Sequence, residues 1–78
     1  MASGIPPYTH DDCIQIVEGY ITSAGTRSDF SVFHHGYALG LIGGWELAGL
    51  FSKEEAVAFR GRLKAALEVN EDYEDKHE

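Results

Sequence analysis

The sequence predicts an all-α protein, built as one small domain of three helices at about 9–25, 29–49 and 52–70. Two observations predict this class. Apolar residues recur at intervals of three and four along most of the chain, and no run alternates between apolar and polar residues as a half-buried strand would. Because 78 residues suffice for a single domain, we expect residues 1–70 to form it and residues 71–78 to form an acidic, flexible tail.

The first helix is predicted by its start, its apolar side and its end. Pro6 and Pro7 favour an extended lead-in, and Thr9 is well placed to cap the first turn, with two aspartates following it. One side of the helix is apolar and carries Cys13, Ile14, Ile16, Val17, Tyr20, Ile21 and Ala24. Gly25 is expected to end the helix, since glycine is common just after a last turn.

The third helix has the clearest start signal. Ser52 and Glu55 in "SKEE" form the spacing of a capping box, in which each side chain bonds a backbone N–H at the helix start. Phe51 lies just outside and is expected to pack on Ala56. The apolar residues that follow at helical spacing are Phe59, Leu63, Ala66 and Leu67.

The second helix, which Ser28 or Ser31 can cap, is unusually rich in glycine. Small residues recur every four positions, at Gly36, Gly40, Gly44 and Ala48. Such a row lets another backbone approach closely, so we predict a helix-packing role for it. Glycines also weaken a helix, by up to about 1 kcal/mol each. We favour one helix with a kink over a break at Gly43–Gly44.

This helix is apolar on nearly every side. An aromatic and aliphatic row lies beside the glycines, at Phe33, Tyr37, Leu41 and Trp45, and further apolar residues lie opposite, at Val32, Leu39, Ile42 and Leu50. Two neighbouring helices cannot surround such a helix, so part of its surface must be exposed or covered from outside the chain. A second copy is the simplest cover, and we predict a homodimer.

A lipid bilayer is another candidate cover. The segment 30–51 is long enough to cross a bilayer, but His34, His35 and Glu46 lie within it, and a charge such as Glu46 is costly at that depth. We therefore expect no membrane span. For binding to a protein partner, Trp45 with Glu46 is the predicted anchor if Trp45 is exposed rather than in the core, and Tyr37 and Phe33 extend the partner-binding surface.

No motif for catalysis or for a cofactor stands out. His34 and His35 are adjacent and point about 100° apart on a helix. A zinc site would need one of them to meet His10 and Cys13, and we favour ordinary histidines and a buried cysteine instead. The glycines lack the GxGxxG or GxxxxGKS pattern of nucleotide loops. We therefore predict no enzyme, no metal and no cofactor.

The charge is concentrated at the C-terminal end. The net charge is −7, and "EVNEDYEDKHE" at 68–78 holds six acidic residues and one lysine, which leaves −5 there. We expect removal of 70–78 to leave the fold intact. Direct binding of nucleic acid is disfavoured, because phosphate contacts need a clustered basic face. The single cysteine, Cys13, fits a reducing, cytoplasmic compartment.

The small size, the acidic tail "EVNEDYEDKHE", the lone Cys13 and the segment "GWELAGLFSKEE" resemble the short acidic accessory proteins of phages and mobile elements, including anti-CRISPR-like inhibitors. The resemblance implies a protein that occupies a surface of a larger host machine, such as a nucleic-acid-binding complex. We expect a protein-interaction module that binds and inhibits a host protein. The alternatives are a self-associating adaptor without catalytic activity and a small metal-binding protein.

Overall fold

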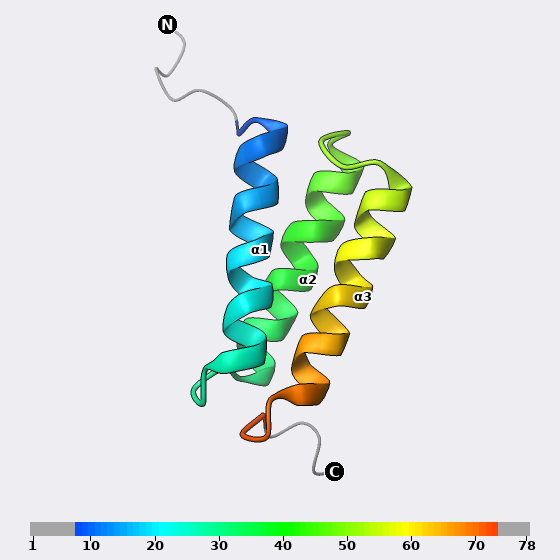
Figure 1. Ribbon diagram of the computed structural model, residues 1–78. Coiled ribbons are helices and arrows are strands. Elements are labelled where there is room, and N and C mark those ends of the chain that lie inside the picture. Colours follow the sequence, from blue (N-terminus) through cyan, green and yellow to red (C-terminus); the bar gives the residue numbers. More distant parts are fainter. Residues whose placement is uncertain (1–7, 74–78) are drawn as a thin grey trace, which may run out of the picture.

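The computed structural model describes residues 8–73, which form an antiparallel bundle of three helices (Figure 1). They are α1 (His10–Thr26), α2 (Val32–Leu47) and α3 (Lys53–Val69). No strand occurs between residues 8 and 73, so the all-α prediction is confirmed. Within the same range, no helix is both long and apolar enough to cross a membrane. The predicted lead-in at Pro6–Pro7 lies outside the described residues.

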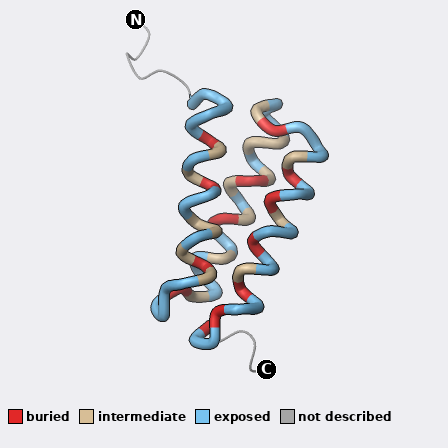
Figure 2. The backbone as a smooth tube through the Cα atoms, viewed as in Figure 1, coloured by how far each residue is buried: buried red, intermediate tan, exposed pale blue. Residues whose placement is uncertain are grey.

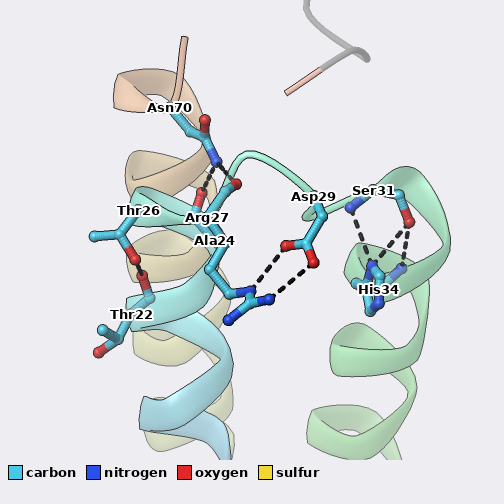
Figure 3. Close-up of polar contacts among 8 residues, drawn as sticks. All are labelled: Thr22, Ala24, Thr26, Arg27, Asp29, Ser31, His34 and Asn70. Carbon is cyan, nitrogen blue, oxygen red and sulfur yellow. Dashed lines mark hydrogen bonds and ion pairs between the residues drawn. The ribbon is translucent and has the colours of Figure 1, made fainter. Parts of the chain in front are cut away.

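Each helix begins at a capping box, as local sequence chemistry dictates. Thr9 caps α1 and Ser52 caps α3, which confirms both predictions. Of the two serines proposed for the second helix, Ser31 is the cap, and its partner is His34. Helix α2 therefore starts about three residues later than predicted. The preceding link is held by Arg27 and Asp29, which form two hydrogen bonds of 2.8 Å (Figure 3).

Two glycine predictions need correction or refinement. Gly25 does not end the first helix, because α1 continues to Thr26; Gly25 instead lies against α3, where an added Cβ would sit 3.5 Å from the Cβ of Ala66. The second helix runs without a break through Gly43–Gly44 and ends at Leu47, two residues before the predicted end. Gly49 then turns the chain with φ of 84°, a conformation that glycine adopts without strain.

The core lies between the three helices, where the buried segments in Figure 2 face one another. It has two parts. One lies near the α2–α3 turn and contains Cys13, Val17, Ile42, Phe51, Ala56 and Phe59. The other lies near the α1–α2 turn and contains Ala24, Phe30, Ala38, Leu63, Leu67 and Tyr73. Phe51 and Ala56 share the first part, in agreement with the predicted contact.

The folded domain extends past the predicted boundary at residue 70. Tyr73 is only 3% exposed and belongs to the core. The side-chain N–H₂ of Asn70 donates to the carbonyl oxygens of Ala24, at 2.7 Å, and Arg27, at 2.9 Å (Figure 3). These contacts attach the end of α3 to α1. These contacts argue against the expectation that residues 70–78 are dispensable for folding, because removal of Asn70 and Tyr73 would break them. Residues 74–78 lie outside the described residues.

Candidate functional site

Helix α2 has one side in the core and one side toward solvent. Ala38 and Ile42 are buried against α1 and α3. The opposite side we call the outer face of α2; it consists of Val32, Phe33, Gly36, Tyr37, Gly40, Gly44, Leu47 and Ala48. All of these are exposed, and they recur at the helical spacing that places them on one side. The outer face therefore runs along the whole helix.

The outer face is apolar although it is exposed. Phe33 is 79% exposed, Tyr37 55% and Leu47 92%. None of the residues of this face carries a charge. The solvent sides of the other helices are different, since Glu18 of α1 and Arg62 of α3 form an exposed ion pair of 3.4 Å. A continuous uncharged strip of this kind is typical of a surface that another molecule covers.

The glycine row lies open in the middle of this face. A Cβ built on Gly36, Gly40 or Gly44 would meet no atom within 4 Å. Within one chain, the row therefore does not serve the close helix packing that we expected for it and for Ala48. A larger side chain at Gly40 would not overfill the bundle either. The row leaves a bare strip of backbone between the bulky side chains of Phe33 and Leu47.

Trp45 belongs mainly to the core and only borders the outer face. It is partly buried, packs against the core next to Ile42, and its ring lies 5.9 Å from that of Phe51. The ring of Tyr8 also contacts it in an edge-on arrangement, with ring centroids 5.7 Å apart. Of the predicted partner-binding residues, Phe33 and Tyr37 are thus the exposed ones. Tyr37 also lies 5.8 Å from the ring of Tyr20, which extends the apolar surface onto α1.

Glu46 is paired within the chain rather than left for a partner. Its carboxylate accepts a 3.0 Å hydrogen bond from the guanidinium of Arg60 on α3. This ion pair lies on the α2–α3 side of the bundle, away from the outer face of α2. Because both side chains are partly exposed, the pair contributes little to stability. The predicted pair of Trp45 with Glu46 is therefore divided between two sides of the helix.

A groove between α2 and α3 was not anticipated from the sequence. It has a volume of about 410 Å³. Leu39, Leu67 and Tyr73 supply its apolar lining, and the polar lining comes from His35, Arg60, Lys64 and Glu68. These residues come from both helices and from the segment after α3, so no local sequence pattern relates them. His35 is hydrogen-bonded within this groove, with its Nδ1 3.2 Å from the hydroxyl oxygen of Tyr73.

The four residues considered for a metal site lie at opposite ends of the bundle. His10 and Cys13 are on the first turns of α1, whereas His34 and His35 are on the first turns of the antiparallel α2 (Figure 1). Among residues 8–73, no three histidine, cysteine or acidic side chains are grouped to hold a metal ion. The meeting of these residues that a zinc site would have required therefore does not occur.

The individual groups have structural partners of their own. Burial, reinforced by the negative charge of Asp12, raises the pKa of the Cys13 thiol. Cys13 is thus a poor nucleophile, because the reactive species is the thiolate. The pKa of Glu55 is lowered, first by the backbone N–H of Ser52 and then by its 2.7 Å contact with His10. This contact joins the start of α1 to the start of α3.

Comparison of the chain with protein-family models, with curated proteins and with solved structures finds no match. On the surface of the bundle, the outer face of α2 is a feature that the packing of a single chain does not explain.

Proposed function

We propose that this protein is a non-catalytic protein-interaction module and that the outer face of α2 is its docking surface. One observation carries the proposal: Phe33, Tyr37 and Leu47 are largely exposed on a helix side without a single charged residue. Fully burying a leucine or phenylalanine side chain yields about 1.5–3 kcal/mol. Removing these side chains from water together would supply a substantial part of a binding free energy.

The proposal includes the more specific expectation from the sequence, namely a cytoplasmic inhibitor that occupies a surface of a larger host protein. A rigid helix with exposed aromatic side chains suits this mode, because aromatic residues are enriched among the side chains that dominate binding energy. The helix can insert into an apolar groove of the partner, with Phe33 and Tyr37 one turn apart as anchors.

The test is affinity capture with a charged substitution on the docking surface. Tagged wild-type protein, Phe33→Glu and Val57→Glu are each exposed to a lysate of cells that carry the gene, and retained proteins are quantified. Val57 is the matched control, because it is a 57% exposed apolar residue on α3, outside the outer face of α2. We expect the partner to be retained by wild type and by Val57→Glu and lost with Phe33→Glu.

Two outcomes would contradict the proposal or its specific form. If all three proteins retain the same partner equally, the outer face of α2 is not the docking surface. If only other copies of the chain are retained, the hypothesis of an inhibitor of a foreign protein is wrong. The hypothesis of a self-associating adaptor then remains. Once a partner is identified, calorimetry with the same variants adds a second criterion, since burial of an apolar face gives a negative heat-capacity change on binding.

A further inference from the structure

We infer that the outer face of α2 pairs with the same face of a second copy, antiparallel, about a two-fold axis at Gly40. The inference rests on the proposed function, because it concerns the same docking surface: a second copy covers the face in the free protein, and a foreign partner would have to displace it. Its first support is the arrangement of residues around Gly40. Gly36 and Gly44 lie four positions on either side, and Phe33 and Leu47 lie seven positions on either side.

This symmetry makes the face complementary to itself. In a two-fold interface the same patch meets itself, and residue i of one copy contacts residue j of the other. With the axis at Gly40, Gly40 meets Gly40 of the second copy and Gly36 meets Gly44. Phe33 then meets Leu47 at both ends, about 10 Å from the axis, given the rise of 1.5 Å per residue.

The open glycine row allows the two α2 helices to approach each other closely. Apart from the adjacent backbone of α2 itself, a Cβ at Gly36, Gly40 or Gly44 would meet nothing within 4 Å, so no other helix covers these positions. Two bare strips of backbone can therefore approach closely at the centre of the pair. The exposed side chains of Phe33 and Leu47 lie beyond the strip and close its two ends. The row thus acquires a role that it lacks within one chain.

The ends of α2 favour the antiparallel direction. The first turn of α2 holds no acidic residue and the last turn holds no basic residue, so nothing of that kind offsets the helix dipole. An antiparallel pair places the positive end of each helix beside the negative end of the other. A parallel pair would align like ends. It would also place Phe33 against Phe33 at one end and Leu47 against Leu47 at the other. The two helices would then be separated by different distances at their two ends.

Charge permits a second copy at this face, and the area suffices for it. A chain with net charge −7 repels its own copy, and pairing through the outer face of α2 adds no contact between acidic residues because the face has none. Aromatic side chains bury about 150–250 Å² each. With Leu47, Val32 and the glycines, the face offers on the order of 500 Å² per copy. Two copies would bury about 1,000 Å², the lower limit for a specific interface.

The first test measures mass. Sedimentation or light scattering of the wild type should show twice the chain mass of 8.6 kDa at high concentration and dissociation on dilution. Gly40→Leu should fold, as checked by circular dichroism, and should weaken the pairing at least tenfold. Gly61→Leu is the matched control, because Gly61 is an exposed α3 glycine with equally open surroundings, and it should pair as wild type does. A mass of one chain at every concentration overturns the inference.

The second test measures direction. Phe33→Cys and Leu47→Cys are treated with a short bismaleimide, each alone and mixed. The antiparallel register predicts cross-linking only in the mixture, because equivalent residues lie about 20 Å apart across the axis. Cross-linking of either variant alone would show a different register and overturn the inference. Wild type checks that the buried Cys13 does not react.

The two proposals fail separately. If the chain stays monomeric but Phe33→Glu abolishes capture of a foreign protein, the docking surface is supported. The inference that a second copy binds there is then wrong. If neither pairing nor capture depends on Phe33, both proposals are wrong.

Discussion

Replacing Gly40 by alanine should stabilise a single chain. Gly40 lies inside α2, where glycine costs about 1 kcal/mol relative to alanine in helix propensity. The added methyl group would meet no atom within 4 Å, so no packing contact is lost and no neighbour must move. The expected change in the free energy of unfolding is therefore the propensity difference alone, about +1 kcal/mol. For a domain of this size, such a change raises Tm by about 4–8 °C.

The assay is thermal unfolding followed by circular dichroism at several protein concentrations, with Gly61→Ala as the control. At low concentration both variants should unfold at higher temperature than the wild type. At high concentration the paired wild type gains stability by mass action, whereas Gly40→Ala should gain less because its methyl group separates the two helices. Gly61→Ala should keep its advantage at every concentration.

A lower Tm for Gly40→Ala than for wild type at low concentration would mean that Gly40 is packed within the chain. The described position of the outer face of α2 would then be wrong. A constant difference between Gly40→Ala and wild type at all concentrations would remove the support for close contact between copies at this residue.

Three further predictions concern the ends of the bundle. Asn70→Ala should lower the free energy of unfolding in urea by about 1–3 kcal/mol, because two backbone carbonyls of the α1 end lose their donor. A chain ending at Asn70 should be less stable than one ending at Tyr73, since only the second keeps the buried ring; equal urea midpoints would contradict this. Glu55 has a lowered pKa in the folded state, through the N–H of Ser52 and then His10. Its contribution to stability is therefore present above the usual glutamate pKa of about 4.3 and is lost as the pH falls through the lower folded value. Below about pH 4.3, Glu55→Gln should accordingly lose stability less steeply than wild type in urea titrations.

The sequence by itself determined the helices and the candidate surface, because both depend on local spacing. Capping by Thr9 and Ser52 joins residues three positions apart, so the pattern reveals it without knowledge of the fold. The glycine row of α2 is likewise a property of one helix. Local spacing also showed that α2 holds more apolar surface than its neighbours can cover.

Only the tertiary structure decided which side of each residue is covered, because that depends on partners distant in the chain. Gly25 is packed against α3 rather than ending α1, and Asn70 bonds carbonyls more than forty residues away. Trp45 joins the core, and Glu46 pairs with Arg60 across the bundle. Helical spacing places residues on a common face, but the assembled helices determine whether that face meets the core or the solvent.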